Sequence, residues 1–321
     1  MIRIGIVGIG YLGRIHLAVL QELAAQFQIV GVFDRNPIEL KDSTNATQEL
    51  IVFNTYQELL HSVDAVAIIA STPAHFQLAR EAVLLGKAVF VEKPMCATLQ
   101  EARLLYALAQ QQQQQQCFIQ VGHIERFNPA IVAAGSFLEA QKCLTFEAIR
   151  TAPFQPRGTE VSVVLDLMIH DLDLLLTQTS SAVTSIAVEA RCEQSFYPDE
   201  VWAKLKFADG LDATIFSSRI AVQKQRSIRI HTPQHLLALD LLEKSASVQR
   251  TSNLENEAIH VEQSNSLQVQ WLAFAAAYHK GRAPQVGAEA GLRALELAFE
   301  IEARAIAQIA HNSKPLHNNN D

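Results

Sequence analysis

The segment Ile2-Arg3-Ile4-Gly5-Ile6-Val7-Gly8-Ile9-Gly10-Tyr11-Leu12-Gly13 decides the fold of the first half of this chain. Its first six residues are mostly β-branched and predict a buried strand. Three glycines, Gly8, Gly10 and Gly13, follow at once, and the run 14–26 after them predicts a helix. A GxGxxG string alone is a weak signal, because glycine is common. Strand, glycine turn and helix in this order predict a turn that binds a dinucleotide.

Each glycine of this turn has its own expected role. Gly8 permits the tight turn, Gly10 lets a pyrophosphate approach the backbone, and Gly13 lets helix and strand pack closely. The N-terminus of the following helix offers unpaired N–H groups and a partial positive charge to the phosphates. We expect Tyr11 and Leu12, which stand between the glycines, to contact the cofactor as well.

A second strand, residues 29–33, ends at Asp34. A carboxylate at this place accepts hydrogen bonds from the adenosine ribose hydroxyls and repels a 2′-phosphate, which favours NAD over NADP. Arg35 keeps NADP open, since an adjacent guanidinium can stack on adenine or bind a phosphate. The alternative for Asp34 is a capping role in the loop before Pro37.

Strands and helices continue to alternate as far as residue 121. Apolar strands at 65–70, 87–91 and 118–121, separated by helical segments, predict a doubly wound parallel sheet covered on both faces. Ligands of such sheets lie beyond the carboxyl ends of the strands. Two strand ends therefore matter, Ser71-Thr72-Pro73-Ala74-His75 and Glu92-Lys93-Pro94.

The run 163–176 is apolar in nearly every helical direction, which predicts a helix buried on all sides. Asp166, His170, Asp173 and Thr177 recur in it at steps of four, three and four, which predicts a single polar stripe. Because burying charge without partners is costly, the stripe should face either a ligand cavity or a matched set of protein groups.

Beyond residue 177 the pattern changes to period-two runs joined by short turns, which indicates antiparallel strands. Helical segments at 266–279 and 288–310 follow. The sequence therefore predicts an α/β protein with a Rossmann domain for NAD at 1–122 and a second domain, with mostly antiparallel strands, at 123–321.

Composition restricts the partners. The 321 residues carry a formal net charge of −7, which argues against nucleic acid or an anionic membrane surface. The first residues enter a strand without a signal-peptide pattern, and no apolar run reaches the roughly 18 residues of a membrane span, so we expect a cytoplasmic protein.

Cysteines 96, 117, 143 and 192 lack metal-like spacing and are expected to be reduced structural thiols. No metal site is expected, because one helix would supply every ligand.

Together, the three glycines, the Glu92-Lys93-Pro94 tripeptide and the Asp166-xxx-His170 pair resemble the Gfo/Idh/MocA family of NAD(P)-dependent sugar and inositol dehydrogenases. The resemblance implies a Rossmann domain followed by an α/β domain for substrate binding and oligomerisation, which contains a large, mostly antiparallel open sheet. One face of that sheet usually forms the contact of a homodimer or homotetramer. The runs 122–129 and 153–157 look most like the bacterial branch that oxidises the 3-hydroxyl of UDP-N-acetylglucosamine.

In this family the lysine of the tripeptide and the Asp and His of the DxxxH pair converge on the nicotinamide and the substrate. The resemblance thus implies Lys93, Asp166 and His170 as catalytic residues. His75 resembles a family histidine near the cofactor, with a helix-cap role as the alternative. The expected cofactor site adds Ser71, Thr72, Pro73, His75, Glu92 and Lys93 to the glycine turn, Asp34 and Arg35.

Further polar side chains are candidates for holding substrate hydroxyls or a nucleotide diphosphate. Arginine can grip phosphate oxygens with two parallel bonds. Each arginine could equally be structural, and Asp173 could bond a sugar hydroxyl or cap the polar stripe. The candidates are Lys93, Arg126, Asn128, Arg150, Arg157, His170 and Asp173.

Oxidising a secondary alcohol needs a hydride acceptor and a base. Neutral imidazole, with a reference pKa of roughly 6.5, suits His170 to the second task, and Asp166 one turn earlier could fix its tautomer. Lys93 could also move the proton, and the sequence leaves both bases open. The leading hypothesis is an NAD-dependent nucleotide-sugar dehydrogenase. The alternatives are an inositol or free-sugar dehydrogenase and a non-catalytic regulatory protein that binds the dinucleotide.

Overall fold

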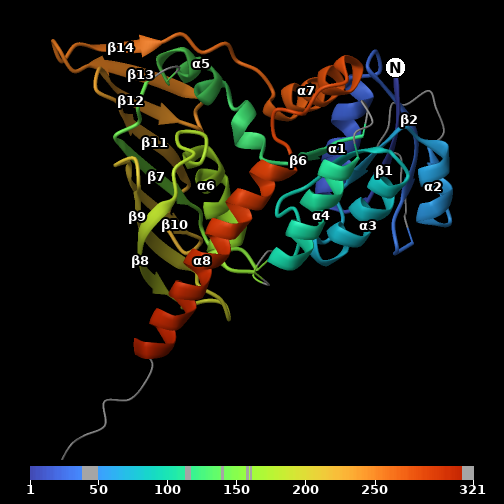
Figure 1. Ribbon diagram of the computed structural model, residues 1–321, viewed down its shortest axis with the longest axis horizontal. Coiled ribbons are helices and arrows are strands. Elements are labelled where there is room, and N and C mark those ends of the chain that lie inside the picture. The colour runs from blue at the N-terminus through green and yellow to red at the C-terminus, as the bar shows by residue number, and fades with distance from the viewer. Residues whose placement is uncertain (38–49, 113–116, 139–140, 157–158, 160, 313–321) are drawn as a thin grey trace, which may run out of the picture. The chain divides into compact units, whose positions relative to one another are not determined.

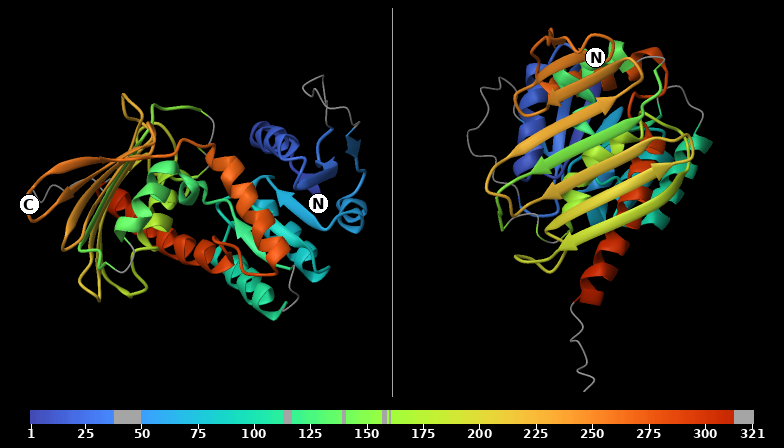
Figure 2. Two further views of the ribbon diagram at one scale, coloured as in Figure 1. Left: turned by 90° about the horizontal axis from the view of Figure 1, so that it is seen from above. Right: turned by 90° about the vertical axis from the view of Figure 1, so that its left-hand side faces the viewer.

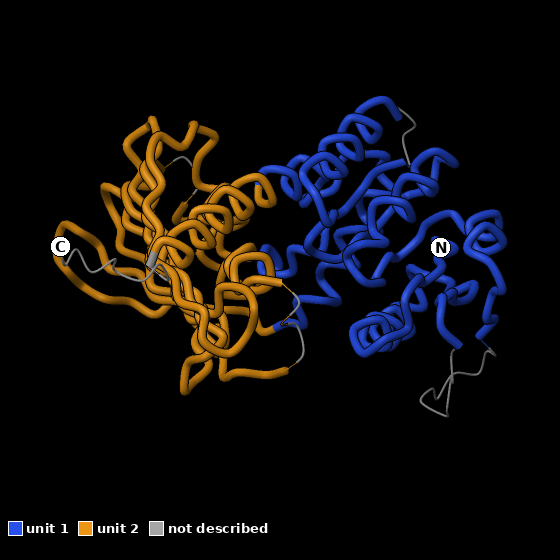
Figure 3. The backbone as a smooth tube through the Cα atoms, turned by 90° about the horizontal axis from the view of Figure 1, so that it is seen from below, with its two compact units in different colours: residues 1–127, 264–293 blue, residues 128–263, 294–321 orange. Residues whose placement is uncertain are grey.

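A computed structural model describes residues 1–37, 50–112, 117–138, 141–156, 159 and 161–312. The chain forms two compact units (Figure 3), one from residues 1–127 with 264–293 and the other from 128–263 with the residues from 294 on. The sequence placed one boundary after residue 122. The structure differs because the segment 264–293 returns to the first unit, where its apolar residues cover part of the sheet.

The first unit is built on a six-stranded sheet with the order β3-β2-β1-β4-β5-β6 (Figure 1). All neighbouring strands in it are parallel, which confirms the predicted Rossmann sheet. The chain order reverses between β1 and β4, and this switch point is where ligands of such sheets bind. The strands are β1 (Ile2–Val7), β2 (Phe27–Phe33), β3 (Ile51–Val52), β4 (Ala65–Ile68), β5 (Ala88–Val91) and β6 (Ile119–Val121).

Helices cover both faces of this sheet. One face carries α1 (Tyr11–Glu22) and α7 (Ser266–Lys280), whose side chains join those of β1, β4 and β5 in one apolar cluster. Trp271 and Phe274 of α7 are fully buried there. The remaining helices of the unit are α2 (Tyr56–Ser62), α3 (Thr72–Leu84) and α4 (Leu99–Gln111), with the short helix η1 (Ile124–Phe127) after β6.

Local sequence starts two of these helices in the same way. Thr55 caps α2 and Thr98 caps α4, and each hydroxyl accepts a hydrogen bond from the backbone N–H of a glutamate three residues on. The side chains of Glu58 and Glu101 accept in return from the cap backbone. These capping boxes satisfy N–H groups that the helix itself leaves unpaired.

The second unit is built on an eight-stranded sheet with the order β14-β13-β12-β11-β7-β10-β9-β8. Every neighbouring pair is antiparallel except β7 with β10, which confirms the predicted mostly antiparallel sheet. The strands are β7 (Thr145–Thr151), β8 (Val183–Arg191), β9 (Glu200–Phe207), β10 (Asp212–Ser218), β11 (Gln225–His231), β12 (His235–Asp240), β13 (Ser245–Arg250) and β14 (Asn256–Ile259).

Among the described residues of this unit, helices pack on one face of the sheet and not on the other. These are α5 (Pro129–Leu138), the π-helical turn η2 (Val164–Met168) and α6 (Ile169–Leu175). The right-hand view in Figure 2 looks onto the opposite face, where the strands lie bare. The last helix, α8 (Ala288–Asn312), contains the residues at which the chain passes from the first unit into the second.

We expect Phe274→Ala to lower the free energy of unfolding by about 3–5 kcal/mol, because it empties a fully buried site in the apolar cluster beneath the first sheet. Urea unfolding followed by circular dichroism measures the change. Leu272→Ala, on the same helix at a side chain that is 40% exposed, is the control and should cost less than about 1 kcal/mol. Equal losses for the two variants would refute the packing role of α7.

Candidate active site

The glycine turn has the geometry that the sequence predicts. Gly8 has φ +90°, and a Cβ placed there would lie 2.6 Å from the backbone nitrogen of Ala70. A Cβ on Gly13 would lie 2.0 Å from the carbonyl oxygen of Gly8, so strand end and helix approach too closely for any side chain. By contrast, a Cβ on Gly10 would meet no atom within 4 Å. Space is thus left above Gly10 alone among the three.

The start of α1 suits an anionic ligand. Gly10 caps this helix without a side-chain hydrogen bond, and its first turn carries no acidic residue. Tyr11 and Leu12 are exposed at 67% and 42%. The positive end of the helix dipole therefore lies at the open space above Gly10, which would favour a pyrophosphate there.

Asp34 connects the end of β2 to the glycine turn. One carboxylate oxygen accepts a hydrogen bond from the backbone N–H of Ile9 at 2.8 Å, and the other accepts from that of Asn36 at 2.9 Å. The contact with Asn36 is the loop-capping role considered as an alternative. Asp34 is partly exposed, so its outer lone pairs still reach solvent.

The end of β4 leads into α3, with Ser71 as the helix cap and Pro73 in the first turn. His75 is buried in that turn. Its Nδ1 lies 2.9 Å from the carbonyl oxygen of Pro94 and its Nε2 lies 2.9 Å from that of Ala70. Burial lowers the pKa of His75 despite these two carbonyls and the charge of Glu92. The buried ring of His75 therefore connects the turn after β4 to the turn after β5.

At the end of β5, Glu92 is buried and Lys93 is partly exposed. Glu92 Oε1 lies 3.2 Å from Nε2 of His16 in α1, and Oε2 accepts a hydrogen bond from the Lys93 backbone N–H. Burial by itself raises the pKa of Glu92, but His16 and Lys93 outweigh it, and the pKa lies below its ordinary value. Sequence reasoning missed His16, a histidine on the apolar face of α1 beside Leu17 and Leu20.

These features all lie at the end of the sheet where the strands have their carboxyl ends. The glycine turn follows β1, Asp34 follows β2, His75 follows β4 and Lys93 follows β5, and the four strands are parallel neighbours. The first unit thus assembles all of the expected cofactor residues at the carboxyl ends of its strands.

The second unit carries Asp166 and His170 on the segment η2–α6. This segment is not a uniform helix, because residues 164–168 form a π-helical turn. Asp166 and His170 are partly exposed, whereas Met168 and Ile169 between them are buried. A π-turn within a helix is often found at functional sites.

The predicted polar stripe does not continue along this helix. Asp173 is 1% exposed, and Thr177 is exposed with its hydroxyl donating to the Leu174 carbonyl. The residue that ties the helix to the sheet is instead Asp171, which accepts hydrogen bonds from Nε and Nη2 of Arg150 at 2.9 and 2.7 Å. Both side chains are buried, so this pair gives Arg150 the structural role that the sequence left open as an alternative.

The remaining candidates for substrate binding are Asn128, Arg126 and Arg157. Asn128 is 4% exposed, its Nδ2 donates to the Leu241 carbonyl, and its Oδ1 accepts from the Ala130 N–H at the start of α5. The structure thus gives Asn128 a helix-capping role in place of a substrate contact. Arg126 is partly exposed on η1. Arg157 lies outside the described residues.

The cysteines show no sign of a chemical role. All four thiols are free, and Cys192 alone is exposed. Burial and the charge of Glu101 raise the pKa of Cys96 to about 12, which keeps this thiol protonated near the tripeptide. Among the described residues no group of His, Cys, Asp and Glu is arranged to hold a metal ion, and no helix is long and apolar enough to cross a bilayer.

Comparisons with known proteins agree with this geometry. Residues 2–123 match the Gfo/Idh/MocA oxidoreductase family with an NAD-binding Rossmann fold. The chain is 30% identical over 314 residues to UDP-N-acetylglucosamine 3-dehydrogenase from Acidithiobacillus ferrooxidans, covering 93% of this chain and 96% of that enzyme. A solved structure of that enzyme superposes with a TM-score of 0.88, covering 96% of this chain and 99% of that one.

More distant relatives share the fold. Inositol 2-dehydrogenase from Agrobacterium fabrum is 26% identical over 54% of this chain and 53% of its own length. Levoglucosan dehydrogenase, solved with NADH and L-sorbose, has a TM-score of 0.80 at 14% identity and covers 96% of this chain and 97% of its own.

We expect Gly10→Ala to reduce affinity for NAD at least about tenfold, since the added methyl group fills the open space where the backbone must approach a pyrophosphate. Its own φ of −70° suits alanine, so its melting temperature should stay near that of the wild type. Gly13→Ala, unlike Gly10→Ala, should also lower the melting temperature, because its Cβ collides with the Gly8 carbonyl. Titration calorimetry and thermal melts measure the two effects. Unchanged NAD affinity in Gly10→Ala would contradict the assignment.

Proposed function

This chain belongs to the Gfo/Idh/MocA oxidoreductase family, and from that premise we propose that it is an NAD-dependent dehydrogenase acting on a nucleotide sugar of the UDP-N-acetylglucosamine type. The observation that carries the proposal is the similarity to UDP-N-acetylglucosamine 3-dehydrogenase, which extends over nearly the full length of both chains. In this reaction a secondary hydroxyl of the sugar becomes a ketone.

Asp34 supports NAD as the cofactor over NADP. Its carboxylate is held at the end of β2 by two backbone N–H groups, and the loop that follows carries the exposed Arg35. A fixed anion at this place accepts ribose hydroxyls and repels a 2′-phosphate. The glycine turn, Ser71, Thr72, Pro73 and the Glu92-Lys93 pair would complete the cofactor site, with His75 supporting two of its turns.

The cofactor, when bound, supplies the hydride acceptor. The chain must then remove the hydroxyl proton and hold the substrate oxygen. His170 is suited to the proton, because a neutral imidazole accepts it near neutral pH. Asp166, on the preceding turn and partly exposed like His170, would orient the ring and stabilise the imidazolium. Lys93 would donate a hydrogen bond to the same substrate oxygen, or take its proton.

We expect Lys93→Ala and His170→Ala each to lower the turnover number by orders of magnitude with UDP-N-acetylglucosamine, while NAD affinity stays nearly unchanged, because both groups act on the substrate hydroxyl. NADH absorbance measures the rates, with UDP-sugars, inositols and free sugars compared. Lys280→Ala and His311→Ala, at exposed positions on α7 and α8, are matched controls. Wild-type turnover in either site variant would overturn the catalytic roles of Lys93 and His170. If the wild-type protein binds NAD but forms no NADH with any of these substrates, a non-catalytic protein is favoured.

We also propose that the bare sheet face of the second unit mediates a homodimer or homotetramer. On this face Trp202 of β9 stacks on Phe216 of β10, with ring centroids 4.2 Å apart, and Trp202 is 42% exposed. In register beside Phe216 stands Ile149 of β7, so the three side chains form a raised apolar ridge.

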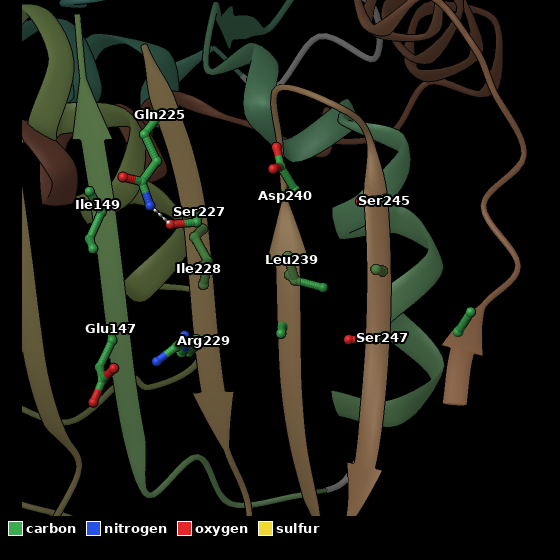
Figure 4. Close-up of a pocket in the computed structure, with 13 residues that line it drawn as sticks. Glu147, Ile149, Gln225, Ser227, Ile228, Arg229, Leu239, Asp240, Ser245 and Ser247 are labelled. Atoms are coloured by element: carbon green, nitrogen blue, oxygen red, sulfur yellow. Dashed lines mark hydrogen bonds between the residues drawn. The ribbon is translucent and has the colours of Figure 1, made fainter. Parts of the chain in front are cut away.

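A groove of about 560 Å³ lies next to the ridge on the same face (Figure 4). Small side chains floor it, while Glu147 and Arg229 stand in register at its side. A two-fold axis through this face would set the ridge of one copy into the groove of the other and pair the opposite charges. The small residues are Ser227, Ala238, Ser245, Ser247 and Ala258.

We expect Trp202→Glu to convert the oligomer into smaller species in light scattering coupled to gel filtration, because a carboxylate replaces the largest exposed apolar side chain of the ridge. Val132→Glu, an exposed site on α5, is the control and should keep the wild-type mass. A monomeric wild-type protein, or an unchanged mass for Trp202→Glu, would refute this interface.

A further inference from the structure

Three buried side chains in the first unit form a single directed chain of hydrogen bonds toward Lys93. Trp271 Nε1 in α7 donates to Nδ1 of His16 at 3.2 Å, and His16 Nε2 lies 3.2 Å from Glu92 Oε1. Glu92 Oε2 in turn accepts from the Lys93 backbone N–H at 3.2 Å. Trp271 and His16 are 0% and 1% exposed, so water does not compete for these bonds.

The chemistry of the groups sets the direction of the chain. An indole N–H only donates, so Nδ1 of His16 must accept and carries no proton. The proton of the neutral ring therefore lies on Nε2, where it is donated to the Glu92 carboxylate. Trp271 is held in place by its own packing, with its ring 4.4 Å from that of Phe90 and also against Phe27 and Phe274.

The space around the Glu92 carboxylate matches its size closely. A Cβ on Gly122 would lie 2.7 Å from Glu92 Oε1, so only glycine at that position leaves room for the carboxylate beside His16. Both Glu92 oxygens thus have fixed donors, on one side from α1 and on the other from the turn that carries Lys93.

We propose that His16 is a positioning residue: held in one tautomer by Trp271, it fixes the Glu92 carboxylate and, through the Lys93 backbone N–H, the turn from which Lys93 reaches the substrate. The proposal deepens the proposed function and rests on it for the role of Lys93. The helix α7, which belongs to the first unit although it follows the whole second sheet, thereby acquires a part in catalysis through its indole N–H.

The first test needs no substrate. In hydrogen exchange followed by mass spectrometry, His16→Phe should speed exchange in a peptide spanning residues 89–98, which retains label at the Lys93 amide, because Glu92 loses its fixed partner. His16→Gln keeps a donor near the place of Nε2 and should exchange more slowly than His16→Phe. Trp271→Phe keeps the ring but removes the N–H and should accelerate exchange by less. Wild-type exchange in both His16→Phe and Trp271→Phe would overturn the proposal, whatever the protein's substrate.

The second test separates positioning from a general structural role. His16→Phe should lower kcat about 10- to 100-fold with a smaller change in KM, as expected for a displaced reacting group, and His16→Gln should recover much of the loss. In a Glu92→Gln background His16→Phe should have little further effect, because both changes break the same chain. Additive losses in this cycle would show that His16 does not act through Glu92. Should His16→Phe fail to fold, the same cycle is run with Trp271→Phe, which removes the N–H that holds His16, and additive losses there count against the proposal.

Discussion

Two parallel hydrogen bonds between Arg150 and Asp171 set the orientation of the helix on which the second unit depends. Successive residues of an α-helix point about 100° apart. With Asp171 paired to Arg150 of β7 inside the protein, its neighbour His170 lies about 100° around the helix and remains partly exposed. Removing one partner of such a buried pair typically costs about 3–5 kcal/mol. The ion pair therefore restricts the helix to the one rotation that presents His170 and Asp166 together.

In the first unit, close approach of the backbone fixes the position of helix α1 relative to the sheet. Gly8 and Gly13 allow strand β1 and helix α1 to touch, which brings His16 of α1 within reach of Glu92 at the end of β5. His75 then joins the turns after β4 and β5 through two backbone carbonyls. Each turn at this edge is thus fixed by a side chain from another element. The polar groups at the carboxyl ends of these strands are thus held by contacts within the protein.

Much of this arrangement follows from the sequence, because local pattern decides it. The strand–glycine–helix order and the apolar strands predict the parallel sheet, and the period-two runs after residue 177 predict the second sheet. Buried polar pairs, by contrast, could not be predicted from local sequence pattern. Arg150 looks like a ligand for phosphate and Asn128 like a contact for sugar, and only tertiary structure shows that Asp171 and the Leu241 carbonyl engage them. Spacing alone likewise treats 163–176 as a regular helix, since the π-turn arises from packing and not from residue preference.

The return of residues 264–293 to the first unit has a consequence for how the protein folds. On the ribosome the strands β1 to β6 are complete by residue 121, yet Trp271 and Phe274, which cover their apolar face, are made only after the entire second sheet. Contacts of such long sequence separation form late, because a large loop must close first. The nascent nucleotide-binding half therefore emerges with an uncovered hydrophobic surface, and its folding is completed only once residues 264–293 have been translated.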